Sequence, residues 1–69
     1  MPTVKYYVHV SPTTSDAMTL AFMALLVEDN RAFEWSRTGF IVKVPDQRIH
    51  RVHMERKCVQ FGFTFASNP

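Results

Sequence analysis

Histidine and cysteine are the side chains in this sequence best suited to metal binding or nucleophilic chemistry. His50 and His53 stand three residues apart, which would place both imidazoles on one side of a helix. Adding His9 or Cys58 would give a metal cluster, but structural zinc sites take four ligands in paired spacings, and no such second pair occurs here. We therefore predict no metal and no cofactor, with the histidines exposed on a basic segment.

The remaining reactive residues do not form a catalytic arrangement. A cysteine nucleophile needs a base in contact with it and a third, orienting group, so Cys58, which stands alone, is predicted to be a buried, reduced thiol. Glu28 and Asp29 are adjacent and would point to different sides of a helix, whereas acid–base catalysis needs groups that converge on one bond. We predict that the chain is not an enzyme and has no catalytic residue.

Residues 17–27 are the most informative segment of the chain, because Thr19 is the only polar residue among them. A helix on the surface of a small domain normally has one apolar stripe and one polar face. A chain of 69 residues is also too short to stabilise itself comfortably around one core. The sequence therefore predicts a homodimer. The predicted dimer interface consists of Met18, Phe22, Leu25 and Leu26.

The apolar segment is too short to be a membrane span. Its eleven residues would cover about 16 Å of helix, against about 30 Å for the hydrocarbon core of a bilayer. No charged, then apolar, then small-residue sequence opens the chain, as it would in a secretory signal. We expect a cytoplasmic protein without a membrane partner.

The sequence predicts a single α+β domain over residues 1–69. Alternation over residues 4–10 indicates a half-buried strand, and Thr13 with Asp16 forms a variant capping box at the start of a helix at about residues 14–29. Asn30 can adopt the left-handed conformation that ends helices. Residues 33–36 and 40–44 then alternate on either side of a turn. We predict one helix packed on an antiparallel sheet of three or four strands, in the order β-α-β-β(-β).

The segment over residues 46–57 matches two templates about equally. Ile49, Val52 and Arg56 follow the spacing of a helix, whereas His50, Val52 and Met54 follow that of a strand. Because residues 45–47 form a short turn, typical of a hairpin, we predict a strand. Apolar residues then alternate from Val59 to Phe65, which predicts a final strand.

Basic and aromatic residues supply candidates for a partner surface. The net charge is only +2, but arginine, lysine and histidine are concentrated in residues 48–57. Aromatic residues and arginine are enriched among the residues that dominate binding energy at interfaces. The predicted partner-binding residues are Tyr7, Trp35, Arg37, Arg48 and Arg51.

Two resemblances bear on function. The segment Phe61-Gly62-Phe63-Thr64-Phe65 resembles part of the signature strand of the RNA recognition motif, although that family continues with a further helix and strand. This resemblance implies an RNA- or DNA-binding module that uses the strand aromatics and the basic 48–57 segment.

In size and composition, the chain is similar to small bacteriophage accessory proteins that bind and disable a host protein. This second resemblance implies a homodimeric module that inhibits a host or regulatory protein, such as a transcription regulator, an ATPase or a defence complex, by occupying its surface. We take this as the leading hypothesis, with nucleic-acid binding as the alternative and the sequestering of a small anionic ligand as a third.

Overall fold

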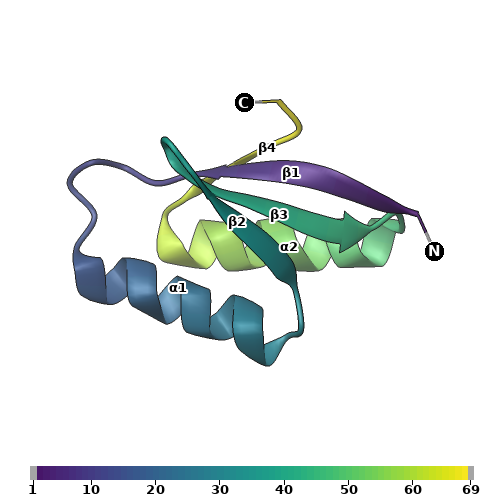
Figure 1. Cartoon of the computed structure of the whole chain (residues 1–69), viewed down its shortest axis with the longest axis horizontal. Coiled ribbons are helices and arrows are strands. Elements are labelled where there is room, and N and C mark those ends of the chain that lie inside the picture. The colour runs from purple at the N-terminus through teal and green to yellow at the C-terminus, as the bar shows by residue number, and fades with distance from the viewer. Residues whose placement is uncertain (1, 69) are drawn as a thin grey trace.

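The computed structural model describes residues 2–68, which form four strands and two helices (Figure 1). In chain order these are β1 (Thr3–His9), α1 (Asp16–Glu28), β2 (Ala32–Ser36), β3 (Gly39–Pro45), α2 (Arg48–Phe61) and β4 (Thr64–Ala66). The prediction of an α+β chain with an antiparallel sheet is confirmed. The predicted element order is wrong in one respect, because a second helix stands between the third and fourth strands.

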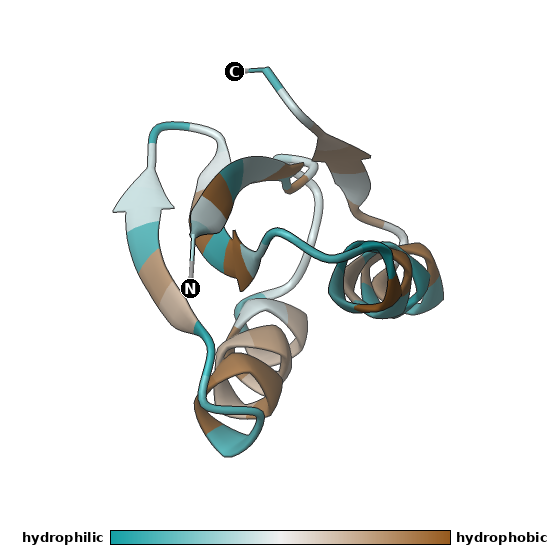
Figure 2. Cartoon of the chain, turned by 90° about the vertical axis from the view of Figure 1, so that its right-hand side faces the viewer, coloured by the Kyte–Doolittle hydropathy of each residue, from teal (hydrophilic) through white to brown (hydrophobic). Residues whose placement is uncertain are grey.

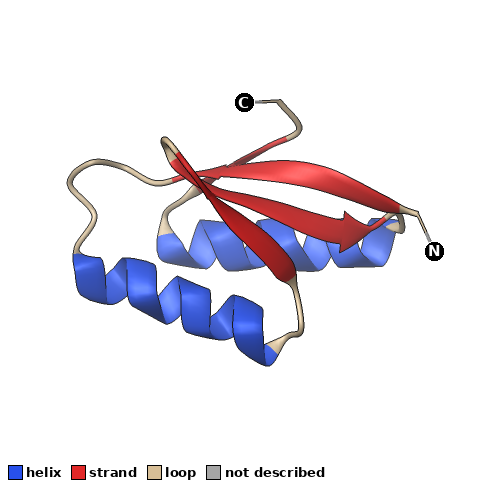
Figure 3. Cartoon of the chain, in the orientation of Figure 1, coloured by secondary structure: helices blue, strands red, loops and turns tan. Residues whose placement is uncertain are grey.

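The four strands form one sheet in the order β2-β3-β1-β4, and every neighbouring pair is antiparallel. Both helices lie on the same side of this sheet (Figure 3). Each helix connects two strands that are separated in the sheet by a third, which is the split β-α-β (ferredoxin-like) topology. The arrangement gives two layers, so one face of the sheet is covered by helices and the other is left bare.

The first helix lies within the predicted range, but a different residue caps it. Ser15 has the extended backbone of an N-cap, and its hydroxyl accepts a hydrogen bond from the Met18 backbone N–H at 3.2 Å. The prediction that Thr13 caps the helix is therefore wrong. Asn30 does adopt a left-handed conformation, with φ of 56°, just after the helix ends.

The predicted strand over residues 46–57 is wrong, since Arg48–Phe61 form α2. Met54, Cys58 and Phe61 are spaced by four and three residues, and a helix turns all three toward the core, whereas a strand would put Phe61 on the opposite face from Met54 and Cys58. Gly62 ends the helix in the left-handed conformation, and the Phe63 N–H donates to the Cys58 carbonyl at 2.8 Å. The predicted final strand is consequently reduced to the three residues of β4.

The β2–β3 hairpin follows the prediction and joins β1 tightly at its turn. The Val10 N–H donates to the Thr38 carbonyl at 2.7 Å, and Gly39 pairs with His9 across the β1–β3 ladder. Gly39 has φ of 154°, and a Cβ atom at this position would collide with the carbonyl oxygen of Val8. The close approach of the hairpin to β1 therefore requires glycine at residue 39.

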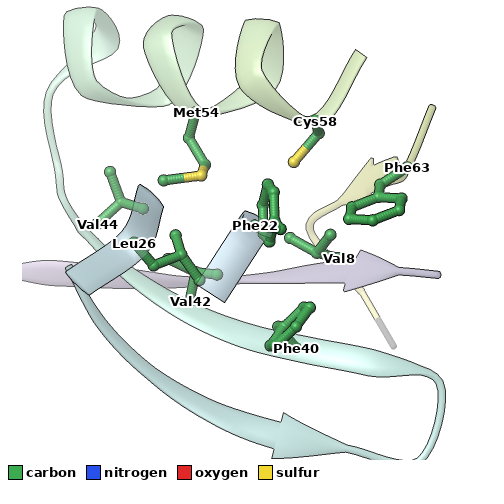
Figure 4. Close-up of a cluster of buried hydrophobic side chains, with 9 residues drawn as sticks. All are labelled: Val8, Phe22, Leu26, Phe40, Val42, Val44, Met54, Cys58 and Phe63. Atoms are coloured by element: carbon green, nitrogen blue, oxygen red, sulfur yellow. The ribbon is translucent and has the colours of Figure 1, made fainter. Parts of the chain in front are cut away.

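The core lies between the sheet and the two helices, and Phe22 of α1 stands at its centre (Figure 4). The Phe22 ring packs edge-on against Phe61 and Phe63, each at a centroid distance of 5.1 Å, and lies 5.4 Å from Phe40. The buried side chains are Val8, Phe22, Leu26, Phe40, Val42, Val44, Met54, Cys58 and Phe63. These residues come from β1, β3, both helices and Phe63, which lies just before β4, so the second helix is integral to the fold.

Over residues 2–68, neither helix has the length and apolar character needed to cross a bilayer.

Candidate binding surfaces

The fold leaves two broad surfaces on opposite sides of the molecule. We call the outward sides of α1 and α2 the helix layer, and we call the side of the sheet that faces away from both helices the open sheet face. Figure 2 shows α1 coloured brown, for hydrophobic residues, over much of its length, while α2 mixes brown and teal. The two helices of the helix layer therefore differ in the chemistry that they can offer to a partner.

The helix layer carries most of the exposed apolar side chains. Leu20 and Val27 of α1 are 61% and 63% exposed, and Ile49 and Val59 of α2 are 73% and 69% exposed. On α1, residues 20, 24 and 27 lie on the side of the helix opposite to the buried Phe22 and Leu26. The large exposed hydrophobic residues are Met18, Leu20, Val27, Trp35, Ile49 and Val59, and all but Trp35 lie on the helices.

Two of the four residues predicted for the dimer interface are misplaced. Phe22 and Leu26 are fully buried against the sheet, so neither can touch a partner. Leu25 is half-buried, and Met18 is 42% exposed at the margin of the helix layer. The sequence indicated that α1 is apolar around its circumference but did not show which side meets the sheet, because a helix without a polar face has no directional pattern.

Charge divides the helix layer between its two helices. Within α1 the charged residues are Asp16 and Glu28, both acidic. Within α2, four basic residues, Arg48, Arg51, Arg56 and Lys57, outnumber the single acidic Glu55. A shallow hollow of about 600 Å³ on the outside of α2 combines both characters, since it is lined by Arg48, Ile49, Val52, His53 and Arg56.

The open sheet face carries polar and basic residues with one aromatic ring. Alternation places Lys5, Tyr7 and His9 of β1 on this face, because Tyr6 and Val8 pack toward the core. The register sets Lys5 directly opposite Lys43 of β3, and Tyr7 opposite Ile41. On its other side, Lys43 pairs with Ala32, so neither direct neighbour of Lys43 supplies a negative charge.

A second hollow opens on this face beside the β2–β3 turn. It has a volume of about 420 Å³ and is lined by Tyr7, His9, Ser36, Arg37, Thr38 and Ile41. The His9 ring is held there by a 2.7 Å hydrogen bond between its Nδ1 and the Thr38 hydroxyl. This end of the face therefore offers an imidazole and a guanidinium beside the half-buried Tyr7 ring.

The five predicted partner-binding residues fall into two groups. Tyr7, Trp35 and Arg37 surround the β2–β3 turn, where Arg37 lines both the Tyr7 hollow and another, of about 370 Å³, that contains Trp35. Trp35 belongs to the helix side of the sheet, because its ring lies 4.9 Å from that of Phe40. Arg48 and Arg51 stand at the start of α2, which lies at the opposite end of the molecule from the turn (Figure 1).

The candidate metal residues do not converge within residues 2–68, where the structure contains no cluster of three or more histidine, cysteine or acidic side chains. His50 instead accepts from Arg31, whose two terminal guanidinium nitrogens each lie 3.3 Å from its Nδ1. This contact joins the loop after α1 to the first turn of α2. His50 therefore has a structural partner, because its Nδ1 atom accepts from Arg31 and is not available to bind a metal.

Cys58 is buried, as predicted, and its environment suppresses its reactivity. Burial raises the pKa of the thiol from its ordinary value of 9.0 to about 12, and the negative charge of Glu55 adds to the shift. Because the thiolate is the nucleophilic form, the thiol is inert at neutral pH.

The aromatic segment that resembled an RNA-binding strand is not a strand. Phe61 lies at the end of α2, Gly62 caps that helix, and Phe63 is buried in the core. Phe65 lies on β4 and stacks on Tyr6, with 4.7 Å between ring centroids. These rings are used inside the fold, so they do not provide the base-stacking platform that the resemblance implied.

Comparisons with protein-family models, with curated proteins and with solved structures found no match to this chain.

Proposed function

We propose that this protein is a binding module that works as a homodimer assembled through the helix layer. One observation carries the proposal: within residues 2–68, most of the large exposed hydrophobic side chains lie on the outer sides of the two helices, namely Leu20 and Val27 of α1 and Ile49 and Val59 of α2. Large apolar side chains exposed on one side of a small protein are typical of a contact with another macromolecule. A second copy also provides the additional core that a chain of 69 residues needs.

Charge favours one arrangement of the two copies. A two-fold axis parallel to the helices sets α1 of one protomer on α2 of its partner, and it does so twice. The acidic α1 then meets the basic α2 across both contacts. An axis perpendicular to the helices would instead pair α1 with α1 and α2 with α2, which brings like charges together. We therefore propose the crossed pairing.

The mass in solution tests the dimer. Light scattering coupled to size exclusion should give twice the chain mass of 8.0 kDa at micromolar concentration. Ile49→Glu should return the mass to that of one chain, because it places a charge within the proposed apolar contact. Thr64→Glu on β4 is the matched control and should remain dimeric. A folded wild-type protein with the mass of a single chain would refute the proposal.

The salt dependence of the dimer separates the two arrangements. Crossed pairing is held partly by opposite charges, so raising sodium chloride from 50 to 500 mM should weaken the dimer. Pairing of like helices should strengthen under the same change, because salt screens their repulsion. A matched cross-link sharpens the result: Ala24→Cys and Val52→Cys chains should form a disulfide with each other when mixed. Neither should cross-link efficiently with itself.

Inhibition of a host or regulatory protein, and a bacteriophage origin, stay predictions that rest on the size and composition of the chain. The cytoplasmic location has the same status. A pull-down that recovers one abundant protein with the wild type, and loses it with Trp35→Ala, would support the inhibitor hypothesis.

A further inference from the structure

The open sheet face has an electrostatic feature that the fold itself does not need. Lys5 and Lys43 are exposed register partners on adjacent strands, and like charges in that position destabilise a sheet. The nearest carboxylate by register is Glu34, which pairs with Ile41 and lies diagonally from Lys43. The pair of ammonium groups is thus arranged to share an anion from outside the chain.

An aromatic ring lies next to this basic pair. Tyr7 follows Lys5 by two residues on the same face, and it is flanked by Ile41 on β3 and Ala66 on β4. Both neighbouring side chains are apolar and smaller than the tyrosine ring, so neither rises above the ring on either side of it. A planar ligand can stack there without displacing a larger side chain.

Beyond Tyr7, the open sheet face carries another cation, the guanidinium of Arg37. His9 and Arg37 line the hollow beside the β2–β3 turn, and the hydrogen bond between the His9 ring and the Thr38 hydroxyl fixes the imidazole at its edge. From Lys5 to His9 the strand advances about 14 Å, at about 3.4 Å per residue. One phosphate group cannot reach both ends of such a track, whereas a chain of several nucleotides can.

We propose that the open sheet face binds single-stranded nucleic acid, with phosphates near Lys5 and Lys43, a base on Tyr7, and a further phosphate near His9 and Arg37. Basic grooves combined with aromatic platforms are the means by which proteins bind single strands without reading their sequence. A duplex hides the faces of its bases and would leave Tyr7 unused. A protein partner is less well matched, because the large exposed hydrophobic side chains lie elsewhere, on the helices and at Trp35.

This site differs from the basic 48–57 segment, which belongs to α2 on the opposite side of the sheet. It is also independent of the proposed dimer, since the helix layer can be covered while the open sheet face remains accessible. Each proposal can therefore fail without the other.

Fluorescence anisotropy with labelled twelve-nucleotide oligo-dT and oligo-U tests the proposal at 50 mM sodium chloride. We expect binding that weakens with salt. A plot of the logarithm of the binding constant against the logarithm of the salt concentration should have a slope of about −2 if Lys5, Lys43 and Arg37 contact phosphates. A twelve-base-pair duplex should bind at least tenfold more weakly. Equal affinity for the duplex, or no binding of either single strand, would overturn the proposal.

Variants locate the site. Tyr7→Ala should weaken binding by about 5- to 150-fold, the usual range for loss of one stacked base, and Tyr7→Leu should behave similarly although it retains apolar bulk. Tyr7→Phe keeps the ring and should bind like the wild type. Lys43→Gln should weaken binding and reduce the salt slope by about 0.7. Circular dichroism and thermal melting establish that each variant is folded.

Arg56→Gln on α2 is the matched control for charge, because it removes one basic group from the opposite side of the molecule. It should leave oligonucleotide binding unchanged. A loss as large as that of Lys43→Gln would overturn the proposed location. Heparin, a polyanion without bases, serves as a competitor, and more of it should be needed to displace the oligonucleotide from the wild type than from Tyr7→Ala. If the same heparin concentration displaces the oligonucleotide from both proteins, charge alone holds it, and the stacking role of Tyr7 is overturned.

Discussion

The helix layer and the open sheet face sit back to back on the same small scaffold, yet they expose opposite chemistry. The helix layer presents large apolar side chains, with acidic residues on one helix and basic residues on the other. The open sheet face presents lysines, a tyrosine ring and small apolar residues. Exposed apolar surface in this protein is therefore concentrated on particular elements, whereas surface hydrophobic residues on monomers are usually scattered.

The two sides of α1 provide the sharpest test of that contrast. Phe22→Ala should lower the free energy of unfolding by about 3–5 kcal/mol, because it opens a cavity among three other rings. Leu20→Ala, on the outer side of the same helix, should cost the folded monomer well under that amount, since Leu20 is largely exposed. Urea denaturation measures both values, and it is done in the Ile49→Glu background so that loss of the proposed dimer contact does not add to the cost of Leu20→Ala. Equal costs would mean that the assignment of inner and outer sides is wrong.

The buried thiol of α2 offers a pH-dependent test of the inner side. The folded protein holds the Cys58 proton until about pH 12, because burial raises the thiol pKa, whereas the unfolded chain releases it near 9.0. Stability from this group is therefore complete below pH 9 and is lost as pH rises from 9 toward 12.

Chemical denaturation at pH 8, 9 and 10 should show a steeper loss for the wild type than for Cys58→Ala, since other titrating groups are common to both. At pH 8 the folded thiol should also resist a disulfide reagent that modifies the urea-unfolded chain at once. Rapid modification of the folded protein would place Cys58 outside the core.

The smallest expected effect lies on the open sheet face. Lys43→Gln removes the like charge opposite Lys5 and should raise the free energy of unfolding by about 0.2–1 kcal/mol at low salt. Lys5→Gln should do the same, and the double variant should gain little more, because either change alone relieves the repulsion. Additive gains would show that the two ammonium groups do not interact.

The sequence correctly predicted those elements for which one local pattern was present and no second pattern competed with it. Alternation in β1 and in the β2–β3 hairpin gave the correct faces, and Asn30 marked the end of α1. The two-layer α+β arrangement followed from these elements. Trp35 and Arg37 are exposed on the hairpin, and their predicted role in binding a partner stays a prediction.

Prediction failed where two periods overlapped. Residues 48–61 fit a strand and a helix about equally, and the helix prevails because only it turns Met54, Cys58 and Phe61 toward the core together. Gly62 followed by Phe63 is a helix C-terminal signal that was present in the sequence and could have decided the question. The outward residues of α1 could not be foreseen, because its sequence has no polar side to show the orientation.

The tight junction between the β2–β3 turn and β1 has a consequence for how this sequence can change over evolutionary time. Every side chain other than hydrogen at residue 39 collides with the Val8 carbonyl, whichever partner the protein binds. In a library that samples all amino acids along the chain, we expect residue 39 to tolerate no replacement. The neighbouring Arg37 is exposed and can be replaced without such a collision, so binding specificity can change beside a glycine that cannot.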